Sequence, residues 1–293
     1  GSPPIAPEPS PGTFTVGTYN LLHPCYAEKY LDVRGADRSG RSNWSLRAPA
    51  IARTLLRSRL DLYLLQEVDP VQMGRDLFRP GSALDAVYGY VHRVHPTREA
   101  GDGVAIVYRR RRYEVVTSDS VPFEAKLPEH EGRKYMCAVA ATLRDRTTGK
   151  TVLVASTHFY AKKARNPRGT LLSYLEGCRG EADAVVWGGD CNDEYKSGLP
   201  PDIIEGGYRS AADEGERRPS KGHKQIDWVF HSPALTSFRS ETSEVFVKLT
   251  REATAVTGRP PSDHFGEAVA LRFAMDVGDT KEDLTVSHLQ DER

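Results

Sequence analysis

Residues 184–193 read AVVWGGDCND, an unbroken apolar run that leads through two glycines to an acid. An apolar run of this length predicts a buried β-strand, because both of its faces have to be covered. Residues 61–68, DLYLLQEV, repeat the pattern with a second apolar run. Each stretch therefore predicts a buried strand with a carboxylate at its tip, Asp190 in the first and Glu67 in the second.

Apolar strands with polar tips recur along the chain, in TVGTYN (15–20), VLVASTH (152–158), QID (225–227) and before GEAVALRF (266–273). The polar residues at these tips are Asn20, Glu67, His158, Asp190, Asn192, Asp227, Asp263 and His264. A single acid at a strand end is usually a turn former. Strands of one sheet can also bring their ends to a common edge, where function concentrates. Both interpretations stay open, separate turn formers or one shared polar site.

The residue types at these tips suit one chemistry. Carboxylate and amide oxygens are the ligands that Mg²⁺ prefers, and Mg²⁺ held in this way usually also binds substrate phosphate. The pair Asp263-His264 can provide a base or a donor, since a carboxylate fixes the tautomer of a histidine. The cysteines, at 25, 137, 178 and 191, show neither a CxxC pair nor zinc spacing. The set favours metal-assisted phosphoryl chemistry.

The rest of the pattern predicts one domain. Further strands are predicted over 103–116 (two strands around a basic turn), 135–145 and 243–249, and helices over 44–60 and 170–184. Pro49 favours a helix start over a helix interior. Two packed sheets with outer helices are the economical architecture, an α/β domain over residues 13–273. We expect a disordered Pro-rich leader with a tag-like Gly-Ser start at 1–12, and a polar tail at 274–293.

Bulk composition excludes several classes. The 40 Lys and Arg residues balance 40 Asp and Glu residues, which argues against a broad grip on duplex DNA. Cysteines without a disulfide spacing indicate an intracellular, reducing compartment. No apolar run is long enough to span a membrane, and the N-terminus lacks the features of a signal peptide. We expect a monomer without a membrane partner.

Seven motifs occur in the order seen in the endonuclease/exonuclease/phosphatase superfamily. They are TYNLL…YA, LLQEV, GDGVAIVYRRRRYEVV, STHF, GGDCN, IDWVF and PSDHF. The chain most resembles the CCR4–nocturnin–Angel group of phosphoesterases over about residues 13–273, and NWSLRAPAI and NPRG resemble the Angel branch. The resemblance implies a four-layer α/β sandwich, two face-to-face β-sheets flanked by helices.

The resemblance also implies metal and base residues. Glu67 resembles the principal ligand of Mg²⁺, and Asn20 lies beside it. Mn²⁺ can take the place of Mg²⁺ in such a site. Asp190 resembles the residue that orients or deprotonates the attacking water. Asn192 resembles a residue that holds a phosphate oxygen or the metal. Asp263 resembles a member of the metal or histidine-orienting shell.

Three further residues receive roles from the same resemblance. His264 resembles the imidazole that contacts the scissile phosphate, and His158 resembles a second phosphate-contacting histidine. Asp227 resembles the carboxylate that orients a site histidine. The loop before the IDWVF strand departs from the deadenylases of the group, because ERRPSKGHKQID (216–227) has no Phe or Tyr to pack on adenine. That departure weakens a preference for poly(A).

Two basic loops flank predicted site residues. The candidates for phosphate contact on these loops are Lys162, Lys163, Arg165, Arg168, Lys221 and Lys224. The run Arg109–Arg112 is interpreted as a solvated hairpin turn.

The resemblance predicts a Mg²⁺-dependent phosphoesterase acting on RNA 3′ ends, in its leading form a 3′–5′ exoribonuclease that binds single-stranded RNA. Two alternatives keep the site, a phosphatase for 2′,3′-cyclic phosphate on RNA ends and a phosphatase for nucleotides or dinucleotides. A non-catalytic module of the same fold would lack Glu67, Asp190 or His264, and all three are present.

Overall fold

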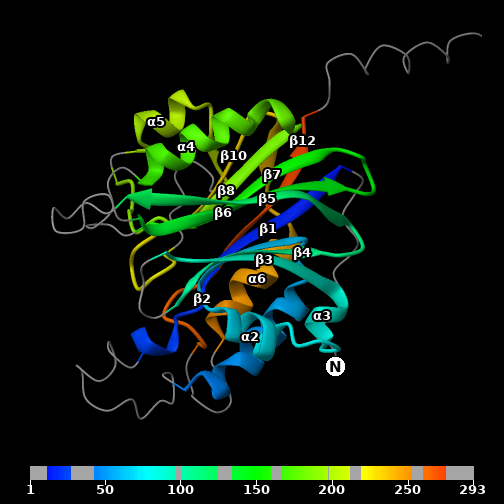
Figure 1. Ribbon diagram of the computed structural model, residues 1–293, viewed down its shortest axis with the longest axis vertical. Helices are drawn as coiled ribbons and strands as arrows, with labels where there is room; N and C mark the ends of the chain where they lie inside the picture. Colours follow the sequence, from blue (N-terminus) through cyan, green and yellow to red (C-terminus); the bar gives the residue numbers. More distant parts are fainter. Residues whose placement is uncertain are drawn as a thin grey trace, which may run out of the picture.

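Two six-stranded mixed sheets lie face to face at the centre of the molecule (Figure 1). The computed structural model describes residues 12–27, 43–96, 101–124, 134–159, 167–196, 198–211, 219–252 and 260–274. The first sheet has the order β11 (Leu235–Phe238), β12 (Glu267–Phe273), β1 (Thr13–Asn20), β2 (Leu62–Val68), β4 (Gly103–Arg109), β3 (Tyr88–Val94). The second has the order β5 (Tyr113–Glu124), β6 (Lys134–Asp145), β7 (Thr151–His158), β8 (Ala184–Asp190), β10 (Asp227–His231), β9 (Arg209–Ser210).

Helices cover the outer face of each sheet, so the order of layers is helix, sheet, sheet, helix (Figure 1). The first sheet is covered by α2 (Trp44–Ser58), a short π-helix (Gln72–Leu77), α3 (Ala83–Val87) and α6 (Glu241–Arg251). The second sheet is covered by α4 (Pro167–Cys178), a 3₁₀ turn (Arg179–Glu181) and α5 (Pro201–Glu205). The predicted α/β sandwich is confirmed.

The central strands are buried on both faces, which explains why their sequences are unbroken apolar runs. Successive side chains of a strand point to opposite faces. In β8, Val186 packs between the sheets and Trp187 packs on the helical side, where it stacks on Phe230 with ring centroids 4.2 Å apart. In β2, Leu64 lies between the sheets and Tyr63 faces the other helical layer.

Parallel pairing brings the polar strand tips to one edge. β1 pairs in parallel with β2, and β7 pairs in parallel with β8. The two strands of each pair therefore end at the same edge of their sheet. The register places His158 opposite Asp190, and antiparallel β10 places Asp227 opposite Asp190 from the other side. Gly189 adopts φ +145, and a Cβ there would lie 1.8 Å from the carbonyl oxygen of Thr157. Only glycine permits this close approach of β7 and β8.

The predicted strand over 243–249 is wrong, because this segment lies in α6. The capping box of Ser240 and Ser243 starts the helix, and the basic residues Lys248 and Arg251 fall in its last turn. Ser243, Phe246, Val247 and Thr250 are buried at helical spacing. The short apolar–polar alternation in SEVFVKL fits a strand or a helix, and the N-terminal capping box favours the helix.

Pro49 does not start a helix. α2 begins at Trp44, and its N-cap Asn43 accepts a hydrogen bond from the backbone of Ser45. Pro49 therefore lies inside the helix, which lacks the hydrogen bond that residue 49 would donate.

The basic run Arg109–Arg112 is a turn in which Arg110 and Arg111 are exposed, as predicted, but it does not close a hairpin. β4 and β5 on either side of it belong to different sheets, so the run is a crossover between them. Arg112 is largely buried and pairs with Asp145 at 2.8 Å and with Asp61 at 3.3 Å. The run therefore ties the two sheets together.

Candidate active site

Asp190, at the end of β8, is the centre of a buried polar cluster. Its Oδ2 accepts a hydrogen bond from Asn20 Nδ2 at 3.1 Å. The Nε2 atoms of His158 and His264 both lie 3.6 Å from the same oxygen. Asp190 is only 2% exposed, so the protein itself provides most of the surroundings of this carboxylate.

Glu67 stands beside Asp190 through a strained turn of the backbone. The pairing of β2 with β4 shifts register between Gln66 and Val68, and Glu67 adopts φ +57. Such a conformation is costly for a residue with a Cβ and is often found at functional sites. Two hydrogen bonds hold the carboxylate, from Asn20 Nδ2 at 3.0 Å and from the backbone N–H of His23 at 2.9 Å.

His264 and Asp227 form a buried pair on the other side of Asp190. His264 Nδ1 lies 2.8 Å from Asp227 Oδ2, and the two side chains are 1% and 0% exposed. His264 Nε2 lies 3.0 Å from the Nζ of Lys221. Lys221 also pairs with Asp263 Oδ2 at 3.0 Å. This arrangement orients the ring of His264 toward Asp190.

Burial and neighbouring charges shift the acid–base behaviour of this cluster. Burial and the nearby carboxylate of Asp227 raise the pKa of Asp190 to about 7. Burial alone would lower the pKa of His264, but Asp227 and Asp190 together raise it to about 9. An ammonium group has no lone pair, so the contact between Lys221 and Nε2 requires neutral His264. Lys221 therefore has to leave Nε2 when His264 is protonated.

The structure brings together Asn20, Glu67, His158, Asp190, Asp227, Asp263, His264 and Lys221, all of them predicted from the sequence. Asn192 is adjacent, but its side-chain amide donates to the carbonyl of Phe159 at 2.6 Å. Its backbone N–H donates to Asp190 Oδ1 at 2.9 Å. The roles of these residues stay predictions.

The other predicted basic residues lie apart from the cluster or beyond the described chain. Arg168 pairs with Asp202 at 2.8 Å at the start of α4, and Lys224 is exposed. Lys162, Lys163 and Arg165 lie outside the described residues.

Two positioning residues, Arg47 and Ser220, were not predicted, although both lie in stretches that carry the family resemblance or its departures. Arg47 of α2 is fully buried and donates to the carbonyls of Leu21, Leu22 and Pro261 at 2.7–3.0 Å. It thus ties the segment after β1 to the segment that carries His264. The hydroxyl of Ser220 accepts hydrogen bonds from the backbone N–H groups of Ile226 and Asp227, each at 3.0 Å.

The residues fit a divalent cation. Asp190, Asp227 and His264 place possible ligand atoms within 4.8 Å of one another. Glu67 shares the donor Asn20 with Asp190, so a cation here would offset several buried negative charges. Each Glu67 oxygen accepts one hydrogen bond and keeps a further lone pair for a metal. Asn20 Oδ1 likewise accepts one hydrogen bond, from the N–H of Leu22 at 2.9 Å, and it carries no charge. Glu67, which offers two carboxylate oxygens, is thus a candidate metal ligand beside the group of Asp190, Asp227 and His264.

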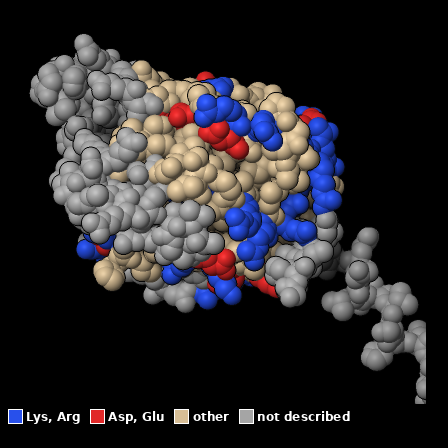
Figure 2. Space-filling model, turned by 90° about the horizontal axis from the view of Figure 1, so that it is seen from below, with Lys and Arg blue, Asp and Glu red and all other residues tan. Residues whose placement is uncertain are grey.

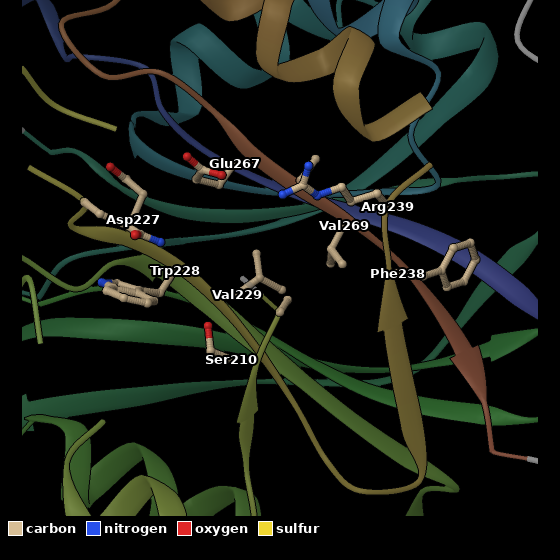
Figure 3. A pocket seen from close by; sticks show the side chains of 11 residues that line it. Ser210, Asp227, Trp228, Val229, Phe238, Arg239, Glu267 and Val269 are labelled. Atoms are coloured by element: carbon tan, nitrogen blue, oxygen red, sulfur yellow. The ribbon is translucent and has the colours of Figure 1, made fainter. Parts of the chain in front are cut away.

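A cavity of about 40 Å³ lies between β10 and β12, behind Asp227 (Figure 3). Arg239, Glu267 and Gln225 contribute to its lining. Ligand pockets for nucleotide-sized molecules are roughly ten times larger. The cavity is therefore too small for a nucleotide-sized substrate.

Taken together, the sandwich and the carboxylate–imidazole cluster define a class of hydrolases that act with a divalent metal. Residues 17–264 match the sequence model of the Endonuclease/Exonuclease/phosphatase family, and the chain belongs to this family. It is thus a metal-dependent phosphoesterase. No curated protein sequence matches the chain significantly.

Solved structures share the fold at low sequence identity. ANGEL2, described as a 2′,3′-cyclic phosphatase, aligns with a TM-score of 0.70 and 17% identity over 89% of this chain and 95% of its own. The human Nocturnin catalytic domain with bound sulfate aligns with a TM-score of 0.65 and 20% identity over 90% and 96%. The mannosyl-6-phosphatase Bt3783 of Bacteroides thetaiotaomicron aligns with a TM-score of 0.63 and 20% identity over 89% and 100%.

Proposed function

We propose that this phosphoesterase hydrolyses phosphate esters at the 3′ ends of RNA with Mg²⁺, primarily as a 3′–5′ exoribonuclease. The observation that carries the chemistry is the position of Asp190. One oxygen of this buried carboxylate lies near Asn20, His158 and His264, and Asn20 also binds the metal candidate Glu67. A base, a metal ligand and two donors therefore surround one point.

Each residue has a task in the proposed hydrolysis. Asp190 accepts a proton from the attacking water, for which its raised pKa suits a base near neutral pH. Protonated His264, held by Asp227, donates to the phosphoryl oxygens as charge develops there. His158 faces the same point from β7. Mg²⁺ bound at Glu67 would supply charge neutralisation.

Lys221 would contact the substrate phosphate. It leaves Nε2 when His264 is protonated, and its Nζ then stays near the point that Asp190 and His264 face. A phosphate oxygen can accept a hydrogen bond from this ammonium, whereas the protonated ring has no lone pair to offer it. The other basic candidates have no described contact with the cluster.

The choice of RNA ends rests on the motif resemblance to the CCR4–nocturnin–Angel group and on charge. Figure 2 shows the molecule from below, on the side of α2, α3 and α6 in Figure 1. Several groups of Lys and Arg residues lie on this face. The full sequence has zero net charge, so the surface as a whole offers no net electrostatic attraction for a polyanion. Such a surface favours a short strand end over long nucleic acid.

A second candidate is a phosphatase for 2′,3′-cyclic phosphate on RNA ends. The likeness to ANGEL2 supports it, together with the segments NWSLRAPAI and NPRG. Mannosyl-6-phosphatase has the same fold, so the fold alone does not choose the substrate.

The test uses one 5′-labelled single-stranded RNA with either a 3′-hydroxyl or a 2′,3′-cyclic phosphate end, incubated with protein and Mg²⁺. Loss of one nucleotide at a time supports the exoribonuclease. Unchanged length with loss of the cyclic phosphate supports the second candidate. If neither occurs while Mg²⁺ binds, the RNA proposal is wrong and mononucleotides and dinucleotides are tested next. Asp190→Asn is the control for contaminating nuclease.

A further inference from the structure

A cysteine, a histidine and an aspartate form a hydrogen-bonded chain beside the candidate active site. Cys25 Sγ lies 3.1 Å from His23 Nδ1. The other ring nitrogen of His23, Nε2, lies 3.0 Å from Asp69 Oδ2. The order thiol, imidazole, carboxylate is that of an activated nucleophile with its base and the group that orients the base.

The backbone fixes the direction of these hydrogen bonds. The backbone N–H of Cys25 donates to His23 Nδ1 at 3.4 Å, so Nδ1 is an acceptor. The proton of neutral His23 is then on Nε2, where it is donated to Asp69. With Nδ1 as acceptor, the Cys25 thiol is the donor of the 3.1 Å contact. The ring is thus placed to take the thiol proton.

The four cysteines differ in surroundings. Cys137 and Cys191 are buried, whereas Cys25 and Cys178 are partly exposed. Cys178 contacts the hydroxyl of Tyr174 in place of an imidazole. Reactive thiols are partly exposed and lie beside a base. Cys25 combines both properties, and Cys178 offers a control of similar exposure in the same chain.

The segment that carries the thiol is joined to the candidate metal ligand. The backbone N–H of His23 donates to Glu67 Oε2 at 2.9 Å. The ring of His23 packs near Tyr26, with centroids 5.8 Å apart. Oxidation of Cys25 Sγ alters its 3.1 Å contact with the ring of His23, and a shift of His23 would move the hydrogen bond to Glu67.

We propose that Cys25 is a peroxide-reactive thiol whose oxidation to a sulfenic acid reduces the phosphoesterase activity. Sulfur attacks one oxygen of hydrogen peroxide, the S–O bond forms and the O–O bond breaks. The thiol proton passes through His23 Nδ1 to the departing hydroxide, which leaves as water. Sulfur is oxidised and peroxide is reduced. The effect on activity, but not the reactivity of the thiol, rests on the proposed function.

The first experiment measures reactivity without any substrate. Folded protein is treated with limiting hydrogen peroxide plus dimedone, which traps sulfenic acid, and labelling of each cysteine is followed by peptide mass. We expect Cys25 to be labelled at least about tenfold faster than Cys178. In His23→Gln and Asp69→Asn the rate at Cys25 should fall toward that of Cys178. Equal rates at Cys25 and Cys178 in the folded wild-type protein, or a Cys25 rate unchanged in both variants, would overturn the proposal.

The second experiment measures coupling to the active site. Peroxide should lower phosphoesterase activity at least about fivefold in the wild type, with recovery in dithiothreitol. Cys25→Ser should be active and insensitive to peroxide. Rapid labelling of Cys25 with unchanged activity would refute the regulatory part. Inactivity of untreated protein on every RNA substrate would instead count against the proposed function, while the labelling result stands.

Discussion

Glu67 and Asp190 share one hydrogen-bond donor, the side-chain amide of Asn20, at 3.0 Å and 3.1 Å. The candidate metal ligand and the candidate base are thus held at a fixed separation by a residue from a third strand. Ligand and base positions that are fixed in advance lower the cost of aligning water with phosphorus. Because the donor is shared, we also expect that a substitution of either carboxylate disturbs the position of the other.

Asp190→Asn should lower kcat by about 10²–10⁴-fold, the usual loss for a general base. The amide keeps the shape of the side chain but cannot accept the proton. Glu67→Gln should cause a loss of similar size through the metal. Circular dichroism and melting temperature establish that both variants fold. A folded Asp190→Asn variant with near-wild-type activity would remove Asp190 from the mechanism.

Mg²⁺ should stabilise the protein through Glu67. A ligand that binds only the folded state adds about 2.7 kcal/mol at a hundredfold excess over Kd, so the melting temperature should rise with Mg²⁺ and fall again with EDTA. Calorimetry of wild type and Glu67→Gln measures the effect. An equal rise in both proteins would place the metal elsewhere.

Lys221→Ala should lower kcat/KM by about 10–100-fold, the value of a charged hydrogen bond to a phosphate. Lys224→Ala is the matched control, because Lys224 is exposed in the same turn and its backbone pairs with that of Lys221. Steady-state kinetics on the best substrate separates the two variants. Equal losses would reduce the role of Lys221 to general surface charge.

The pH dependence of activity follows from two groups. Asp190 acts as a base only when ionised, so activity should rise with pH through about 7. His264 donates only when protonated, so activity should fall above about 9. Asp227 raises both pKa values, and Asp227→Asn should therefore shift both limbs of the pH–rate profile to lower pH. A profile that keeps its position in Asp227→Asn would exclude this pair of assignments.

The polar tips of the strands can be predicted from the sequence, because each apolar run ends within a residue or two of a polar side chain of the candidate site. What joins the tips is the parallel register of β1 with β2 and of β7 with β8, which no local pattern contains. The resemblance to a family supplied that step. The order of the strands was not predicted, because it depends on contacts between distant segments. β3, half-buried at the edge of its sheet, was not predicted either, because YGYVHRV lacks a clear alternation of apolar and polar residues.

Contacts between residues far apart in sequence were the hardest to predict. Lys221 belonged to a set of six basic candidates, and its contacts with Asp263 and with His264, 43 residues away, distinguish it. In the same way, Arg112 reads as part of a charged turn until its partners Asp61 and Asp145 are known. Charge in a sequence gives no measure of burial unless the partners are located.

Arg47→Met should lower the free energy of unfolding by about 3 kcal/mol, because buried acceptors lose their donor. The carbonyls of Leu21, Leu22 and Pro261 all accept from this guanidinium. Arg53→Met is the matched control on the same helix, where Arg53 is exposed and a change within about 0.5 kcal/mol is expected. Urea unfolding measures both.

Activity gives Arg47 a second test, under conditions where the variant is still folded. The two segments that Arg47 ties together lead to Asn20 on one side and to His264 on the other. Arg47→Met should therefore lower kcat and leave KM nearly unchanged, since it loosens the alignment of groups that act in the transition state. Stability equal to that of Arg53→Met, with unchanged kcat, would show that the helix and strands alone position the site.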